Sequence, residues 1–397
     1  MKTFGVKNIF MKTFGVKNIL LITGKFPDVT SDTDGGSIMV SHLVEALRNK
    51  CTLDVLFTRT INNNFINIEG VRKVTFHTNK VRNNNKFLRR LANIEWNSIE
   101  FSQLIPQYDR IIIIHCSKAL GLEKLSQELL DKVVLFPMYL TSSYIRSNEI
   151  VPIGYTEAER KILLKIKKII TPSQSEKNDI IKDYDVAENR IIVIPRAVNS
   201  YIESFVRDES KANKLIYIGA IKKQKRNDDA IVLLSKLKEM EAESHLYLVG
   251  SQQDDELYAH CIDLISKLGL ENDISFCGVL SQKEIAELLN DIDINISVSR
   301  WETFGRGIFE GLCAGLPTVV YNSIDCLSEY ANANSGVSYV ENINDMASKI
   351  YDLCSNPSFY KSQSQKAIEN SPQFSIEKQK ERLLQEILCS QKSIKKE

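Results

Sequence analysis

The chain has 397 residues, 43% hydrophobic and 25% charged, a composition typical of a soluble globular protein with two domains. Its 51 basic residues almost balance its 50 acidic ones, so no global field attracts nucleic acid and we expect no nucleic-acid partner. No apolar run approaches the ~20 residues that cross a bilayer, and no signal-peptide pattern is present, so we expect a cytoplasmic protein.

The chain begins with a duplication, in which MKTFGVKNIF at residues 1–10 recurs as MKTFGVKNIL at residues 11–20. The repeat is too short to be a structural unit. We interpret it as a tandem duplication or a product of cloning, and residues 1–10 as a frayed extension.

Residues 11–198 alternate short apolar segments with amphipathic ones, which predicts a parallel α/β domain. A loop rich in Asp, Ser, Thr and Gly is predicted at residues 24–36, and a helix at residues 37–50. Strands are predicted at Asn18–Thr23, Thr52–Phe57, Arg110–Ile114, Val133–Phe136, Ile169–Ile170 and Ile191–Ile194.

The pattern restarts after residues 199–213, whose polar composition suggests a linker. Three strands here each end in a glycine, a residue that lets the backbone turn tightly or approach a ligand. Because ligands bind at the carboxyl ends of parallel strands, the recurrence favours a nucleotide site over simple turns. The strands with their glycines are Leu215–Ile218 with Gly219, Ser244–Val249 with Gly250, and Ile274–Cys277 with Gly278; further strands are Ile292–Val298 and Thr318–Tyr321.

We divide the chain into the extension at 1–10, domains at 11–198 and 199–375, and a C-terminal helix at 376–397. The helix is amphipathic, so it either docks back on the first domain or lies on a membrane surface. Eight cysteines and five histidines are scattered without metal-binding spacing, which predicts buried free thiols and no metal site. The acidic pairs in Asp32–Asp34 and Asp254–Asp255 are interpreted as polar loop residues.

The most informative segment is SRWETFGRGIFEGLCAGLP at residues 299–317, in which seven residues separate Glu302 from Glu310. Gly315 and Pro317 mark the end of a helix that starts near Gly305, which places Glu302 on a loop and Glu310 in or near the first turn. A helix start with glycines suits a pyrophosphate, and the two carboxylates suit the hydroxyls of the flanking sugar rings.

This segment resembles the E-x7-E motif of retaining glycosyltransferases of family 4, which have the GT-B fold of two Rossmann-like parallel-sheet domains facing a central cleft. The resemblance extends over most of the chain. Its landmarks, in the family's order, are Gly35–Gly36, Ile170–Ser173, Val193–Pro195, Tyr217–Gly219, Lys225, Leu248–Gly250 and Phe276–Gly278.

The resemblance implies an acceptor domain at 11–198 and a nucleotide-sugar donor domain at 199–375. Glu310 would hold the ribose hydroxyls, and Glu302 the transferred sugar. The backbone of Phe304, Gly305 and Arg306 would face the sugar and diphosphate.

The other donor contacts implied are Gly36, which would approach the reacting centre, Gly219, and Gly278, whose segment would pass the base. Lys225 would neutralise the diphosphate and His115 would lie near the donor sugar, so that the catalytic set is Glu302, His115 and Lys225. Three of these residues have a plainer alternative. His115 could be a core histidine, Gly36 a turn residue, and Lys225 part of a solvated basic run.

The sequence departs from the family at two places. Ala220 stands where many relatives have an arginine, and Arg226 or Arg306 would have to replace that cation in the donor site. The usual V-I-P-N-G is here Val193–Ala197, which changes the loop between the domains.

The resemblance implies transfer with retention of configuration by front-side attack, with no cofactor and no metal. We expect a nucleotide-sugar donor, UDP-sugar favoured, and a glycan or lipid-linked acceptor in bacterial surface polysaccharide or glycoconjugate synthesis. The alternatives are a non-catalytic glycosyltransferase-like binding subunit and another GT-B enzyme such as a nucleotide-sugar epimerase.

Two basic stretches of the first half favour an anionic acceptor or peripheral binding to the anionic inner face of the cell membrane. The alternative is that these stretches are solvated loops. One covers Lys161–Lys168. The other contains Arg72, Lys73, Lys80, Arg82, Lys86, Arg89 and Arg90 and no acid.

Overall fold

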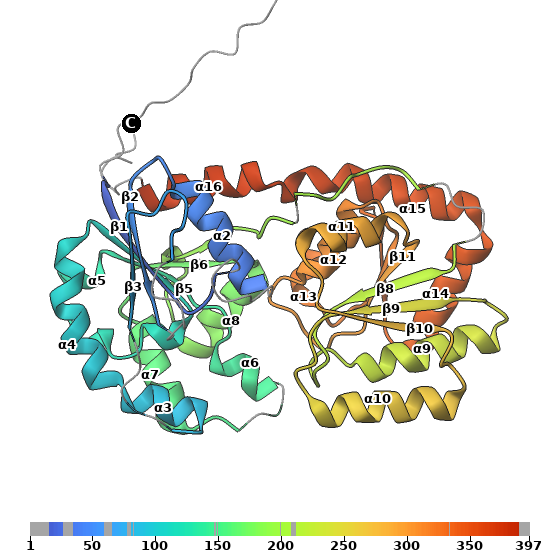
Figure 1. Ribbon diagram of the computed structural model, residues 1–397, viewed down its shortest axis with the longest axis horizontal. Helices are drawn as coiled ribbons and strands as arrows, with labels where there is room; N and C mark the ends of the chain where they lie inside the picture. The colour runs from blue at the N-terminus through green and yellow to red at the C-terminus, as the bar shows by residue number, and fades with distance from the viewer. Residues whose placement is uncertain are drawn as a thin grey trace, which may run out of the picture.

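The computed structural model describes residues 16–26, 35–58, 66–77, 81, 83–146, 148, 150–198, 200–207, 212–332 and 334–388. The chain forms two α/β halves that lie side by side, each with a sheet covered by helices (Figure 1). The duplicated segment 1–10, the loop containing Asp32–Asp34, and the basic residues Lys80 and Arg82 lie outside the described residues.

The first half is built on a seven-stranded sheet in the order β3-β2-β1-β4-β5-β6-β7, in which every pair is parallel. Its central strands are buried on both faces, as their uninterrupted apolar runs require. The strands are β1 Asn18–Thr23, β2 Thr52–Phe57, β3 Lys73–Phe76, β4 Arg110–Ile114, β5 Val133–Phe136, β6 Lys168–Thr171 and β7 Ile191–Val193.

The helices of this half include one unexpected boundary. The helix α2 starts at Gly35, so Gly35 and Gly36 form its first turn and do not end a loop. Glycine has no Cβ and is tolerated at a helix end, so these two residues can begin the helix. The helices are α2 Gly35–Leu47, α3 Lys86–Ala92, α4 Ile94–Leu104, α5 Gln127–Leu130, α6 Thr141–Arg146, α7 Ile153–Leu163 and α8 Gln174–Tyr184. Short 3-10 turns lie at Ile105–Gln107, Cys116–Lys118, Leu122–Lys124 and Glu188–Arg190.

The second half has a six-stranded parallel sheet in the order β10-β9-β8-β11-β12-β13. Its strands are β8 Lys214–Ile218, β9 His245–Val249, β10 Ile274–Gly278, β11 Ile294–Ser297, β12 Thr318–Tyr321 and β13 Val337–Val340. Its helices are α9 Asn227–Glu239, α10 Asp255–Leu268, α11 Gln282–Asn290, α12 Arg306–Cys313, α13 Asp325–Ser328, α14 Ile343–Ser355 and α15 Pro357–Asn370, followed by a 3-10 turn at Ser371–Phe374.

The segment expected to be a linker is packed against the second half where it is described. Arg207 is buried and donates to the carbonyls of Leu289 and Asn290, at the end of α11, and of Ala314, which follows α12. A guanidinium at the carboxyl ends of helices satisfies carbonyls that have no intrahelical partner. Residues 200–207 therefore form part of the second half's framework.

The helix α16, Ile376–Leu388, returns from the second half and lies along α2 of the first (Figure 1). Leu383, Ile387 and Leu388 are buried in the same apolar cluster as Leu43 of α2. Lys168 donates to the backbone carbonyl of Glu386 at 2.7 Å. The apolar face of α16 is therefore part of the core of the first half.

None of the helices in the described residues is long and apolar enough to span a membrane. The described cysteines are free thiols. Cys116, Cys261, Cys313 and Cys326 are buried, and Cys51, Cys277 and Cys354 are half-buried. Cys389 lies outside the described residues.

Candidate active site

A cavity of about 510 Å³ lies between the two halves and is lined by both. On one side it contacts the segments that follow β1 and β4, and on the other those that follow β8 and β9. The carboxyl ends of two parallel sheets therefore face the same space, which is where open α/β sheets bind ligands.

The N-terminus of α12 opens into this cavity, because Gly305, Arg306 and Gly307 all line it. Gly305 has φ +78°, a conformation that glycine adopts without strain. A Cβ on Gly307 would lie 2.7 Å from both the Cβ and the carbonyl oxygen of Ile218, so glycine lets the helix start against the end of β8. The helix start thus presents its first N–H groups to any anion in the cavity.

Glu310 lies directly after the first turn of α12, which begins at Arg306, in agreement with its expected position in or near that turn. Arg306 and Glu310 are therefore an i,i+4 pair, with Nε and Oε1 3.0 Å apart and both side chains buried. Glu310 Oε1 and Arg306 Nε and Nη1 are left without a hydrogen-bond partner among the described residues.

Burial dominates the electrostatics of this pair. It raises the pKa of the Glu310 carboxyl, against the favourable charge of Arg306. It also lowers the pKa of the Arg306 guanidinium, against the charge of Glu310. Buried polar atoms are normally satisfied, so orphaned ones that line a cavity suit a polar ligand there. Ribose hydroxyls and phosphate oxygens both offer the bonds these atoms lack.

Glu302 and Lys225 form a second ion pair, largely but not fully buried, in the cavity wall. The Lys225 side chain is only 15% exposed, so it does not belong to a solvated basic face. Burial opposes its charge, but Glu302 and Tyr217 raise the pKa of the ammonium above its ordinary value. Tyr217 also donates to the Lys225 carbonyl at 2.6 Å, which fixes the loop that carries the lysine.

His115 follows β4 and lines the cavity with a strained backbone, at φ +84°. Its Nδ1 accepts the N–H of Ser117 at 3.2 Å, which leaves the ring proton on Nε2. Burial, together with the nearby charges of Arg90, Lys118, Lys25 and Lys86, holds the pKa of the imidazole well below its usual range. His115 is therefore a neutral hydrogen-bond donor.

Of the other predicted donor-binding residues, Gly36, Gly219 and Phe304 line the cavity. Arg226 is not among its lining residues: it pairs with Asp229 and lies over the Tyr321 ring, 5.5 Å from the centroid. This placement leaves Arg306 as the candidate to replace the arginine missing at Ala220.

Gly278 does not line the cavity either, although the residues that follow it, Val279 and Leu280, do. The Gly278 carbonyl accepts the N–H of Gly250 at 2.8 Å, within the sheet.

Several residues that line the cavity were not predicted, because they meet the other lining residues only through the fold and carry no local sequence signal. Arg90 was predicted only as a member of a basic stretch that favours an anionic acceptor or membrane surface, and it lines the cavity. The missed polar residues include Lys25, Ser117, Lys118, Arg196, Lys222, Ser251, Gln253 and Gln282.

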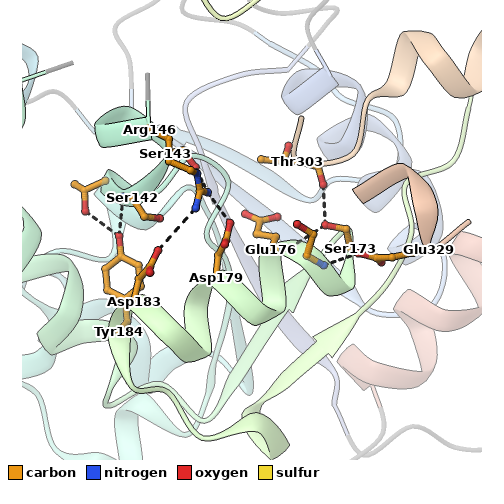
Figure 2. A network of polar contacts seen from close by, with 12 residues as sticks. Ser142, Ser143, Arg146, Ser173, Glu176, Asp179, Asp183, Tyr184, Thr303 and Glu329 are labelled. Atoms are coloured by element: carbon orange, nitrogen blue, oxygen red, sulfur yellow. Dashed lines mark hydrogen bonds and ion pairs between the residues drawn. The ribbon is translucent and has the colours of Figure 1, made fainter. Parts of the chain in front are cut away.

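The first half also holds the loop of the second half directly (Figure 2). The Ser173 hydroxyl donates to the Thr303 carbonyl at 2.8 Å and caps α8 by accepting the N–H of Glu176. Glu329 accepts the N–H groups of Gln174 and Ser175, both at 2.5 Å. Because Thr303 lies directly after Glu302, this contact links the site loop to the opposite domain.

Glu176 lies beside that contact in Figure 2, and both of its carboxylate oxygens are buried without a hydrogen-bond partner among the described residues. Burial raises the pKa of this carboxyl to about 8.

Comparison with known proteins matches the two halves separately. Residues 33–200 match the model described as "Glycosyltransferase Family 4", and residues 200–373 match "Glycosyl transferases group 1". Mannosylfructose-phosphate synthase of Agrobacterium fabrum is 28% identical over 138 residues, 34% of this chain and 30% of that protein. The chain thus aligns with less than a third of this relative's length.

Among solved structures, sucrose-phosphate synthase from Thermosynechococcus elongatus superposes with a TM-score of 0.75 at 16% identity, covering 93% of this chain and 98% of that one. HepE of Anabaena, in complex with UDP and glucose, gives a TM-score of 0.72 at 14% identity over 94% and 99% of the two chains. These similarities establish the two-domain GT-B fold.

Proposed function

Because the chain belongs to glycosyltransferase family 4, we propose that it transfers a sugar from a nucleoside-diphosphate sugar to an acceptor hydroxyl. The observation that carries this proposal is the buried Arg306–Glu310 pair at the start of α12, whose orphaned atoms line the cavity. A UDP-sugar is the favoured donor, since one solved neighbour binds UDP with glucose and UDP-glucose.

In the proposed complex the diphosphate lies at the N-terminus of α12, and Glu310 accepts hydrogen bonds from the ribose hydroxyls. Arg306 supplies a cation beside the diphosphate in place of the arginine absent at Ala220. Lys225 neutralises the leaving group, while its partner Glu302 accepts from hydroxyls of the transferred sugar. His115 donates to the sugar from Nε2.

The proposed reaction breaks the bond between the sugar's anomeric carbon and the β-phosphate oxygen. A new bond forms between that carbon and the acceptor oxygen on the same face, so configuration is retained. The acceptor's proton passes to the departing phosphate oxygen, and the products are the glycosylated acceptor and a nucleoside diphosphate. The protein acts by positioning and electrostatics, so we propose that neither a metal nor a cofactor takes part.

We further propose that the acceptor is a glycan or a lipid-linked molecule, used in surface polysaccharide or glycoconjugate synthesis at the cytoplasmic face of the membrane. Ile150, which precedes α7, and Ile153, its first residue, are 93% and 88% exposed, which suits contact with lipid. Nearby, the ammonium of Lys86 in α3 lies 4.5 Å from the ring centroid of Tyr144 in α6. Sedimentation with anionic vesicles tests this; binding that is absent at low salt contradicts it.

The donor assignment is tested with Glu310→Ala. We expect UDP to raise the melting temperature of the wild type by mass action, and the variant to lose most of that shift and its turnover. Asp263→Ala is the matched control, because it removes the acid of an exposed i,i+4 pair with Lys267 on α10. If Glu310→Ala keeps donor affinity and turnover, the assignment fails.

The same preparation separates the two alternatives. A non-catalytic subunit would bind nucleotide sugars without releasing nucleoside diphosphate in the presence of any acceptor. An epimerase would convert the free nucleotide sugar without an acceptor. We favour transfer because Glu302, Glu310 and Lys225 are all present and face one cavity.

A further inference from the structure

A short segment of the first half, residues 172–175, where β6 leads into α8, is held by side chains and backbone of the second half (Figure 2). The buried Ser173 hydroxyl donates to the Thr303 carbonyl at 2.8 Å. The two carboxylate oxygens of Glu329 accept the backbone N–H groups of the two residues after Ser173. The Tyr330 hydroxyl donates at 2.8 Å to the carbonyl of the proline before Ser173. We call these bonds the interdomain latch.

The latch is connected to the proposed donor site by packing as well as by the chain. Thr303 follows Glu302 directly and lines the cavity. The Tyr330 ring packs edge-on against Phe304 in the same loop and Phe309 in α12, with each ring centroid 5.9 Å away, and both phenylalanines are buried. Because closely packed side chains transmit strain, a displacement of the latch is passed to the loop that carries Glu302.

The two ends of the donor site depend on the latch to different degrees. Glu310, the proposed ribose contact, lies within α12 and is paired there with Arg306. Glu302, the proposed sugar contact, lies on a loop whose next residue is bonded to the first half. Loss of the latch is therefore expected to move the sugar end of the site and to leave the nucleotide end in place.

We propose that the interdomain latch positions Glu302 and its partner Lys225 for sugar transfer, so that Ser173, Glu329 and Tyr330 are positioning residues. This inference rests on the proposed function, since it assigns a role in the same reaction. The three side chains act through the loop and are not among the residues that line the cavity. Small misplacements of a reacting group slow a reaction strongly, which gives the latch a measurable effect on turnover.

Two substitutions test whether the latch reaches the site loop. Tyr330→Phe keeps the packed ring and removes the hydroxyl that donates to the first half. Glu329→Gln keeps the shape of the side chain and replaces one accepting oxygen with an amide that cannot accept. Both bonds are made at residues 172–175, away from the Glu302 loop. In hydrogen-exchange mass spectrometry of the full chain, we expect residues 300–305 to exchange about fivefold faster in each variant than in the wild type.

Tyr360→Phe is the matched control for these variants. It also removes a buried tyrosine hydroxyl, but this one donates at 2.9 Å to the Asp293 carbonyl within the second half. Exchange of residues 300–305 should be the same in this variant as in the wild type.

A third substitution separates turnover from nucleotide affinity. Ser173→Gly removes the direct bond to Thr303, and glycine is an acceptable N-cap for α8. Thermal shift first selects the nucleoside diphosphate that binds among UDP, GDP and ADP, and turnover is the release of that diphosphate from its glucose derivative. We expect turnover to fall about tenfold, while calorimetry gives an affinity for the diphosphate within about twofold of the wild type. Asp254→Gly, which removes the side-chain cap of α10, should change neither quantity.

The outcomes separate this inference from the proposed function. Faster exchange of residues 300–305, with a loss confined to turnover, supports the positioning role. If exchange rises only at residues 173–176, or if diphosphate affinity falls as far as turnover, the positioning role is wrong and the proposed donor site stands. If the wild type binds no nucleoside diphosphate, the proposed function fails and this inference fails with it.

Discussion

The two walls of the cavity are both built from strand ends, helices and loops, but they differ in the charged side chains that their described residues supply. On the second-half wall, Gly307 brings α12 against β8, and both carboxylates are held in largely buried ion pairs. On the first-half wall, His115 sits on strained backbone amid converging cations. One wall is therefore organised by ion pairs between its own residues, while the other places a neutral imidazole beside several cations.

The largest effect should come from breaking an ion pair on the organised wall. Lys225→Ala leaves Glu302 without its cation and removes charge from the leaving group, so we expect turnover to fall by about 10²- to 10³-fold. Lys223→Ala is the control, because Lys223 is exposed in the same basic run. Steady-state kinetics measures both, and equal losses would mean that the buried pair has no special role.

Next in size is the packing that aims α12 at the cavity. Gly307→Ala places a methyl 2.7 Å from the Ile218 carbonyl oxygen, so the helix start must shift. We expect about a 10²-fold loss of turnover from such misplacement, with weaker nucleotide binding. Gly154→Ala in α7 meets only Leu91 Cδ1 at 3.7 Å and should be silent. Comparable losses in both variants would show that the close contact of Gly307 with Ile218 has no special effect on turnover.

On the first-half wall, His115→Ala should lower turnover about tenfold, the scale of one hydrogen bond to the reacting sugar. Nucleotide affinity should change less, because the contact lies opposite the proposed diphosphate site. The depressed pKa keeps the imidazole neutral, so the wild-type rate should have no inflection near pH 6.5 caused by His115. A variant at the exposed His260 serves as control. If the variant lost nucleotide affinity but kept its turnover, the proposed contact between His115 and the sugar would be wrong.

The smallest effect on turnover, but a clear effect on stability, is expected at Glu176. Its pKa is raised from 4.5 to about 8, so the folded state holds a proton that the unfolded state has released between these values. The destabilisation that results from ionising buried Glu176 is therefore absent below pH 4.5, grows as the pH rises, and is complete above pH 8. Glu176→Gln should stabilise the protein by roughly 2–4 kcal/mol at pH 8.5 and by little at pH 4.5. Denaturant unfolding at both values measures this; a gain independent of pH would contradict it.

Much of the fold follows from local pattern, and the exceptions have physical reasons. The strands β1, β2, β4 and β5 have their predicted bounds because each is a short apolar run closed by polar residues. The strand β3 was missed because it is a partly exposed edge strand within a basic stretch.

The part of the site that was predicted also follows from a local sequence pattern. The segment around Gly305 carries its own signals for a helix start, and Glu302 and Glu310 reach the cavity from it. The four-residue spacing of Arg306 and Glu310 was a visible signal for their pairing that sequence reasoning did not use. The partners of Arg90, Ser173 and Arg207 lie far away in the chain, so no local pattern contained them.

The position of α16 has a consequence for how the polypeptide acquires its structure during synthesis. Leu383 and Ile387 complete a core whose other members, such as Leu43, are translated much earlier. The first half must therefore wait, with an apolar face uncovered, while the ribosome makes the whole second half. Its maturation is coupled to that of its neighbour, and chaperone binding to this exposed face is expected to end when residues 376–388 emerge.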